Sequence, residues 1–307
     1  MRNSATATVI AALSLLLMIS SCEKAPQSTG PKYGKSPVSQ TTPIYHFAVH
    51  PLHNPAQLMQ EYQPLMDYLN ERLKGARLTL EASRNYASFE EKYQGRKTEF
   101  LLPNPWQTLQ AMKAGYSVIA EAGEPKDFKG MLIVRKDGGI GEPSDLKGKA
   151  VSYPSPTALA ACIMPQYFLH VHGINVNKDI ENHYVGSQES SIMNVYLKMT
   201  AAGATWPPPW RAFQKDHPEK TAELKVAWET EPLINNSVMA RNDVPAAIRE
   251  QLRKLLTGLH ETENGKEILA NMETARFIPA SDRDYDMVCS YIGRFETEVR
   301  KVETNED

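Results

Sequence analysis

The chain has 307 residues, of which 34 are Lys or Arg and 36 are Asp or Glu, so its formal charge at pH 7 is −2. This balance provides no basic surface for nucleic acid, and that class of partner is excluded. A hydrophobic content of 41% and a charged content of 23% are typical of a globular protein, here long enough for two lobes. Three cysteines are too few for a disulfide framework, and no two have the spacing of zinc ligands.

The first 22 residues have the pattern of an export signal. Arg2 supplies a positive charge, and the apolar stretch that ends at Ile19 is too short to span a bilayer. Ile19-Ser20-Ser21-Cys22 resembles the lipobox of bacterial lipoproteins, whose cysteine is acylated. Cys22 is therefore the predicted lipidation site, after a signal peptide over residues 1–21 and before a flexible tether over residues 22–42. An ordinary signal peptide that is cleaved near a chance cysteine is the alternative.

From Ile44 the chain alternates strands and helices. The expected strands cover residues 45–49, 77–81, 100–102, 116–120, 131–135, 150–152 and 183–185. The expected helices cover residues 57–73, 89–93, 106–114, 158–164, 191–201, 245–259, 261–272 and 284–302. Such alternation predicts an α/β fold with a mostly parallel sheet and helices on both of its faces.

A change of character near Arg135 predicts that a second α/β unit is inserted into the first. Lobe one is expected over residues 43–134 plus 236–307, and lobe two over residues 135–235. The chain would cross between the lobes near Arg135 and again near Glu231 to Asn236, and these two segments would act as the hinge.

Two turns carry hydroxyl and amide side chains that suit an anion. Ser155 and Thr157 precede a helix that is expected from Ala158, and Ser187 and Gln188 follow the strand at 183–185. A helix N-terminus presents free backbone N–H groups and the positive end of the helix dipole, so two such turns at one cleft can bind a small anion. A hydroxyl that merely caps a structural helix is the alternative.

Histidines and tryptophans supply further candidates. His50 lies in the first strand-to-helix loop, which opens on the same cleft, so it is a candidate ligand donor. No metal ion or cofactor is predicted, although convergence of the histidines at 46, 50, 53, 170 and 172 on a metal is the alternative. The run from Trp206 to Trp210 holds three prolines and is expected to be extended, with Trp206 at the cleft and Trp210 packed in the interior.

Four other features are assigned to structure rather than to chemistry. Cys162 and Cys289 are expected to be buried thiols, and Glu90 and Glu91 to be solvated. No catalytic residue is predicted, because the sequence has no nucleophile elbow, phosphate-binding Walker loop, zinc-protease motif or dinucleotide fingerprint.

Four stretches, in this order, resemble the solute-binding proteins of phosphonate, phosphite and phosphate-type ABC importers. They are the helix at 60–69, the segment at 85–89, the run from 132 through 149, and Asp284-Tyr285-Asp286. The resemblance covers residues 44 to 288. It implies the two-lobed fold of class II periplasmic binding proteins, with the ligand cleft between the lobes.

The resemblance also implies positions at the ligand. Tyr86 matches a cleft tyrosine, with simple packing as the alternative, and Asn104 lies where the family has a glycine-containing loop. The family's oxyanion cradle corresponds to Ser155-Pro156-Thr157-Ala158, in which two hydroxyls remain. A family histidine falls at Gln188. Trp206 falls where an acidic residue recognises the amine of aminophosphonates, which favours an oxyanion without an amine.

The sequence thus predicts a monomeric, extracytoplasmic lipoprotein, not an enzyme, that captures a small phosphorus oxyanion by hinge closure. The loaded protein would be presented to an ABC permease in the inner membrane, and the membrane that holds the anchor is left open. A ligand-binding lipoprotein that feeds a sensor kinase is one alternative. An envelope enzyme that acts on phosphoesters or phosphonates is the other.

Overall fold

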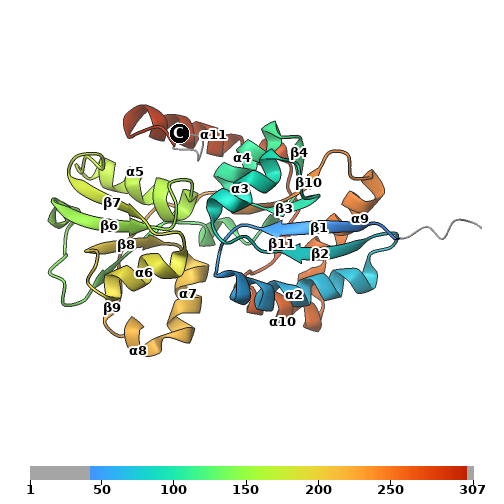
Figure 1. Ribbon diagram of the computed structural model, residues 1–307, viewed down its shortest axis with the longest axis horizontal. Coiled ribbons are helices and arrows are strands. Elements are labelled where there is room, and N and C mark those ends of the chain that lie inside the picture. Colours follow the sequence, from blue (N-terminus) through green and yellow to red (C-terminus); the bar gives the residue numbers. More distant parts are fainter. Residues whose placement is uncertain (1–41, 303–307) are drawn as a thin grey trace, which may run out of the picture. The chain divides into compact units, whose positions relative to one another are not determined.

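Two β-sheets form the framework of the computed structural model, which describes residues 42–302 (Figure 1). The predicted signal peptide, the lipidation site at Cys22 and all but the last residue of the predicted tether lie outside the described residues. Within residues 42–302, no helix combines the length and the apolar composition that crossing a bilayer requires.

The first sheet has the strand order β11-β4-β10-β3-β1-β2. Its strands are β1 (Ile44–Val49), β2 (Arg77–Glu81), β3 (Phe100–Leu102), β4 (Tyr116–Ala122), β10 (Asn236–Arg241) and β11 (Phe277–Ile278). β1 is parallel to β2 and β3, whereas β10 is antiparallel to β3 and β4. The sequence predicted only helices after residue 236 and missed β10, because a short buried apolar run has no distinguishing period.

The second sheet has the strand order β7-β6-β8-β5-β9. Its strands are β5 (Met131–Arg135), β6 (Lys149–Tyr153), β7 (Ile180–Tyr184), β8 (Ala202–Thr205) and β9 (Leu224–Glu229). β6 is parallel to β7 and β8, and β5 is antiparallel to β8 and β9. Both sheets are therefore mixed, where the sequence predicted a mostly parallel arrangement.

The first crossing between the lobes lies earlier in the chain than predicted. β5 was assigned to lobe one, but its backbone hydrogen bonds join it to the second sheet. The chain therefore crosses at residues 123–130, and it returns at 230–235, close to the predicted second crossing. The crossings are bonded to each other, because the Thr230 N–H donates to the Gly130 carbonyl at 2.9 Å and the Leu233 N–H to the Phe128 carbonyl at 2.9 Å.

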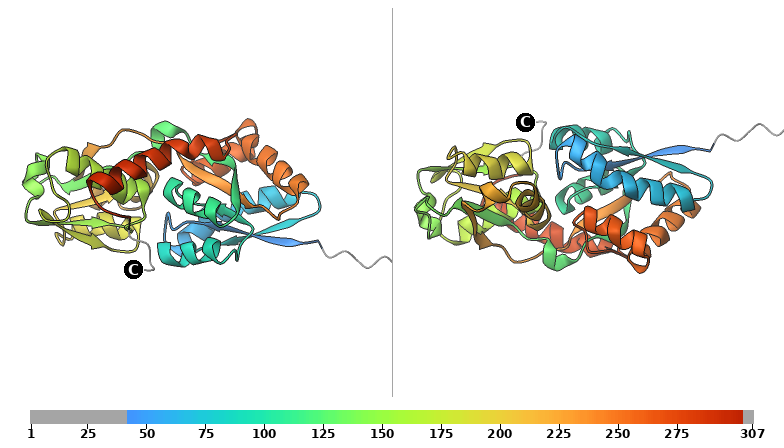
Figure 2. Two further views of the ribbon diagram at one scale, coloured as in Figure 1. Left: turned by 90° about the horizontal axis from the view of Figure 1, so that it is seen from above. Right: turned by 90° about the horizontal axis from the view of Figure 1, so that it is seen from below.

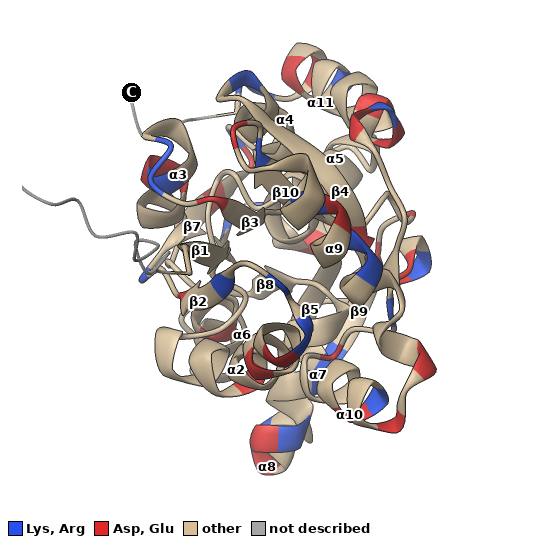
Figure 3. Ribbon diagram, turned by 90° about the vertical axis from the view of Figure 1, so that its right-hand side faces the viewer, with Lys and Arg blue, Asp and Glu red and all other residues tan. Residues whose placement is uncertain are grey.

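Helices cover both faces of each sheet (Figure 1). Around the first sheet lie α2 (Pro55–Arg72), α9 (Ala246–Thr257) and α10 (Glu263–Asn271) on one side, and α3 (Tyr86–Gln94), α4 (Pro105–Lys113) and α11 (Asp286–Glu298) on the other. The helices that follow strands of the second sheet are α5 (Met164–Val171), α6 (Gln188–Tyr196), α7 (Pro207–Asp216) and the short α8 (Pro218–Thr221). Lys and Arg are interspersed with Asp and Glu on outer helices such as α8 and α11 (Figure 3).

The last helix connects the two lobes a third time. α11 starts beside α4 and runs toward α5 of lobe two (Figure 2). The Arg300 guanidinium donates to the Gln166 side chain at 2.8 Å, and the Asn177 side chain donates to the Val299 carbonyl at 2.8 Å. The sequence placed all of residues 236–307 with lobe one, whereas the residues after α11 are held by lobe two.

Candidate functional site

Side chains from both lobes enclose a small cavity where the lobes meet, which we call the junction cavity. Its volume, taken as the space that the centre of a water molecule can occupy, is about 10 Å³. The cavity can therefore hold about one water molecule. Its lining consists of His50, Tyr86, Asn104, Phe128, Ala158, Leu159, Ala160, Ala161, Gln188, Trp206 and Asn236. Most of the predicted ligand residues are thus brought together from distant parts of the sequence. Ser155, Thr157 and Ser187 are not in the lining.

Lobe one contributes His50 directly after β1. Its Nδ1 lies 2.8 Å from the Leu102 carbonyl, and because a carbonyl only accepts, Nδ1 carries the proton. Burial lowers the pKa of His50 to about 4, against the opposing effect of the Leu102 bond. At neutral pH the ring is therefore uncharged, and its Nε2 is a hydrogen-bond acceptor.

Tyr86 and Asn104 stand at the starts of two helices of lobe one. Tyr86 is the first residue of α3, and burial raises the pKa of its phenol, so that the hydroxyl keeps its proton. Asn104 is the N-cap of α4 and forms a capping box with Gln107. Its amide nitrogen also donates across the lobes to the Thr157 carbonyl at 3.2 Å.

The turn at Ser155 and Thr157 does not cap a helix, contrary to one prediction. The helix begins with a π-helical turn over Leu159–Ile163, and its N-cap, Ala158, makes no side-chain bond. The Thr157 hydroxyl instead donates to the Glu90 carboxylate at 2.6 Å, and the Ser155 hydroxyl lies 3.0 Å from that of Thr157. Glu90 is thus buried, where the sequence predicted a solvated residue.

The start of this helix borders the junction cavity. Leu159, Ala160 and Ala161 all line the cavity, and they occupy the first turn, whose N–H groups have no acceptor within the helix. The helix continues through α5 to Val171, so its dipole adds positive potential at this end. π-Helical turns inside helices frequently occur at functional sites.

Ser187 and Gln188 have separate tasks at the start of α6. The Ser187 hydroxyl accepts from the Ser190 N–H at 3.1 Å and so caps the helix. Gln188 enters the cavity, where its amide donates to the Tyr86 hydroxyl at 3.2 Å and its carbonyl accepts from Thr205 at 3.0 Å. α6 sits close to β8 because residue 203 is glycine: a Cβ there would lie 2.4 Å from the Ser191 carbonyl oxygen.

Trp206 forms one wall of the cavity, as predicted. It is 5% exposed, and its ring centroid lies 5.4 Å from that of Phe128 in the first crossing segment. Trp210 packs in the core of lobe two, also as predicted. The three prolines between them are not extended but form the first turn of α7. A proline fits there because the first N–H groups of a helix need no partner within it.

Asn236 is a cavity residue that the sequence analysis treated only as part of the hinge. It is 3% exposed, and its Oδ1 has no hydrogen-bond partner among the described residues. A buried amide oxygen without a partner costs free energy, so it is a place where a bound group gains a hydrogen bond. The available signal was the polar pair Asn235-Asn236 at the second crossing.

A wider groove of about 230 Å³ lies beside the junction cavity and shares Gln188 with it. Its walls include His53 and Gln57 of lobe one, and Glu189 and Asp216 of lobe two. His53 Nε2 lies 3.1 Å from a carboxylate oxygen of Glu61. The Gln57 amide lies within hydrogen-bond distance of both Glu61 and, across the lobes, Asp216. The groove borders the junction cavity at Gln188.

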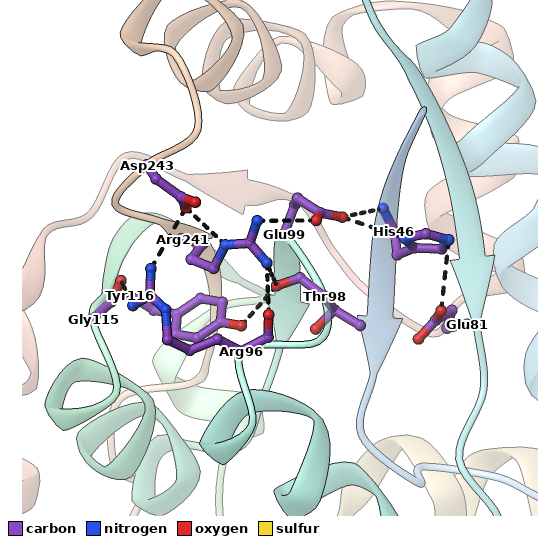
Figure 4. Close-up of polar contacts among 9 residues, drawn as sticks. All are labelled: His46, Glu81, Arg96, Thr98, Glu99, Gly115, Tyr116, Arg241 and Asp243. Carbon is purple, nitrogen blue, oxygen red and sulfur yellow. Dashed lines mark hydrogen bonds and ion pairs between the residues drawn. The ribbon is translucent and has the colours of Figure 1, made fainter. Parts of the chain in front are cut away.

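The alternative of a histidine metal site fails on geometry. His46 lies near the start of β1, at the end away from His50, and its backbone N–H donates to Glu99 at 2.8 Å (Figure 4). Glu99 is held in turn by Arg241 at 3.1 Å (Figure 4). Nowhere in residues 42–302 do three His, Cys, Asp or Glu side chains converge as a metal site would require.

The cysteine prediction is half right. Cys162 is buried, next to the lining of the junction cavity, but Cys289 is exposed on α11. The periodicity of α11 puts Val288 and Ile292 on the packed face, and residue 289 therefore points outward.

Comparison with known proteins agrees with this architecture. A family model described as "ABC transporter, phosphonate, periplasmic substrate-binding protein" matches residues 47–285. A probable ABC transporter phosphite binding protein, PhnD1 of Prochlorococcus marinus, is 26% identical over 196 residues. That alignment spans 60% of this chain and 66% of the relative.

Two solved structures share the fold. The crystal structure of PhnD1 from Prochlorococcus marinus in complex with methylphosphonate has a TM-score of 0.76 at 20% identity, covering 84% of this chain and 100% of that one. A binding component of a phosphonate ABC transporter from Pseudomonas aeruginosa has a TM-score of 0.76 at 16% identity, covering 83% and 87% of the two chains. The prediction of a two-lobed α/β binding-protein fold is thus confirmed.

Proposed function

Because the chain belongs to the family of periplasmic substrate-binding proteins of phosphonate ABC transporters, we propose that it captures a small phosphorus oxyanion in the junction cavity. The family is one of substrate-binding proteins and not of enzymes, and its location is extracytoplasmic. The main observation is the cavity itself, which is lined by Leu159, Ala160 and Ala161 at a helix start of one lobe and by Tyr86 and Asn104 of the other.

The donors and acceptors in the cavity favour an oxyanion that still carries a proton. Among the lining residues there is no Lys or Arg, so the negative charge is balanced by amides, a hydroxyl and a helix dipole. His50 Nε2 and Asn236 Oδ1 are acceptors and suit a P–OH group. Sulfate has no proton to donate at neutral pH and would leave both acceptors without a partner.

Ligand entry requires the lobes to separate. The cavity has room for about one water molecule, and a methylphosphonate ion is larger. The segments 123–130 and 230–235 are the hinge of this motion, and a ligand stabilises the closed arrangement through contacts with both lobes. The closed protein then docks on the permease of an ABC importer.

A ligand screen by thermal unfolding tests this function. We expect methylphosphonate, phosphite or phosphate to stabilise the protein, by about 2.7 kcal/mol when the ligand is at 100 times its Kd. Sulfate and aminoethylphosphonate are the comparison compounds. A response to aminoethylphosphonate alone would show that Trp206 has been misinterpreted, and a response to none of the phosphorus compounds would refute the function.

We also propose that the mature protein is anchored by lipid at Cys22. The support is the lipobox-like Ile19-Ser20-Ser21-Cys22 after an apolar stretch. In a bacterial host fed with labelled palmitate, the full chain should take up label and sediment with membranes, whereas Cys22→Ser should do neither. Equal labelling of both proteins would contradict the anchor.

A further inference from the structure

Three residues of lobe one hold Thr157 of lobe two from two sides. Glu90 accepts from its hydroxyl at 2.6 Å, and Asn104 donates to its carbonyl at 3.2 Å. Gln107 donates to Glu90 at 3.2 Å and bonds reciprocally with Asn104, so that the three are mutually positioned. Glu90, Asn104, Gln107 and Thr157 are each no more than 3% exposed. Such contacts across a buried interface favour the arrangement in which the lobes touch.

The hydroxyl hydrogen bonds of the Ser155–Thr157 turn form a chain that ends at Glu90. The single hydroxyl proton of Thr157 is donated to the carboxylate. The bond between the hydroxyls of Ser155 and Thr157, at 3.0 Å, must therefore be donated by Ser155. Neither hydroxyl has a proton left for another acceptor. Neither residue lines the junction cavity in this arrangement, so an oxyanion in the cavity gains the Thr157 hydroxyl only after Glu90 releases it.

We propose that the Glu90 carboxylate takes the place of the ligand oxyanion on the Ser155–Thr157 turn, where it holds the lobes together and competes with the ligand. Glu90 then sets the affinity for the ligand, because the ligand must interact with the turn more favourably than the Glu90 carboxylate does. The competition part rests on the proposed function, whereas the contact between the lobes does not.

The test uses Glu90→Gln, which keeps the size of the side chain and removes its charge, with Glu91→Gln as the matched control on the exposed side of the same helix. A hydrogen bond to a neutral acceptor is weaker than one to a carboxylate, so the contact between the lobes should loosen. We expect a larger radius of gyration by small-angle scattering for ligand-free Glu90→Gln than for wild type. Methylphosphonate should bind it about fivefold more tightly in calorimetry.

Thr157→Val separates the two roles of the turn. It removes the hydroxyl that Glu90 accepts from, and so should also enlarge the ligand-free protein, but it should weaken methylphosphonate binding because a ligand donor is lost. An unchanged radius of gyration in both variants overturns the proposal whatever the ligand. If wild type binds methylphosphonate and Glu90→Gln binds it equally or more weakly, competition is refuted while the proposed function stands. If no variant binds it, the proposed ligand is wrong and the scattering result alone decides the contact.

Discussion

Trp206→Ala is expected to lower the free energy of unfolding by about 3–5 kcal/mol and to abolish measurable phosphonate binding. The indole is 5% exposed and packs against Phe128 of the crossing segment as well as against the core of lobe one. Its removal leaves a void at the junction of the lobes and removes one wall of the cavity. Urea unfolding measures the first effect, and calorimetry with methylphosphonate on the folded protein measures the second.

Trp210→Ala is the matched control for this experiment. Trp210 is buried to the same degree, at 6% exposure, but packs against Phe213 and the core of lobe two and is not in the cavity lining. It should cost similar stability and leave the affinity of the folded protein close to that of wild type. If both variants lose affinity equally, Trp206 acts only through stability and its place at the ligand is wrong.

Acid should destabilise the protein through His50. Its pKa is about 4 in the folded chain, against an ordinary value of 6.5, because burial disfavours the charged ring. Between these values the unfolded chain binds a proton that the folded chain does not. The associated stability is therefore complete above pH 6.5 and is lost as the pH falls toward 4, by roughly 3 kcal/mol. Urea unfolding at pH 7.5 and at pH 4.5 measures the difference.

His50→Asn isolates this contribution, because an asparagine amide can still donate to the Leu102 carbonyl but does not titrate. The variant should lose distinctly less stability than wild type between the two pH values. Equal losses would mean that other groups cause the acid sensitivity.

His53 and Glu61 lie beside each other and should contribute little to that comparison. Burial lowers the pKa of His53 to about 4 and raises that of Glu61 to about 7. As the pH falls, the folded chain takes up a proton on Glu61, whereas the unfolded chain takes up a proton on His53. Each state thus takes up about one proton between pH 7 and 4.5, and the two effects on stability oppose each other.

The two-lobed architecture and much of the cavity could be predicted from chain length, local patterns and the family resemblance. Strand and helix periodicity gave the α/β class. His50 and Gln188 follow strands at the carboxyl edge of a sheet, where ligands bind in such folds, whereas Tyr86 and Asn104 were expected from the family resemblance. The boundary at β5 could not be predicted, since only its pairing with β8 and β9 assigns it to lobe two.

The site predictions that were wrong or incomplete concern residues whose surroundings depend on contacts between distant parts of the sequence. Glu90 and Glu91 look like an ordinary solvated pair, but Glu90 is 2% exposed and accepts hydrogen bonds from Gln107 of its own lobe and from Thr157 of the other. The same contact removes the Ser155 and Thr157 hydroxyls from the helix start, where local sequence suggests a cap. The buried, unpartnered Oδ1 of Asn236 could not be predicted, because its burial depends on how the two crossing segments and the lobes pack together.

The third connection through α11 places the two ends of the described chain on different lobes. Ile44 is paired with Arg77 in the first sheet, whereas Val299 and Arg300 are bonded to lobe two. Any rotation of one lobe against the other therefore changes the separation between these ends. Fluorescent groups attached before Ile44 and after Val302 would convert that rotation into an optical signal, which makes this scaffold suitable for a sensor of its ligand.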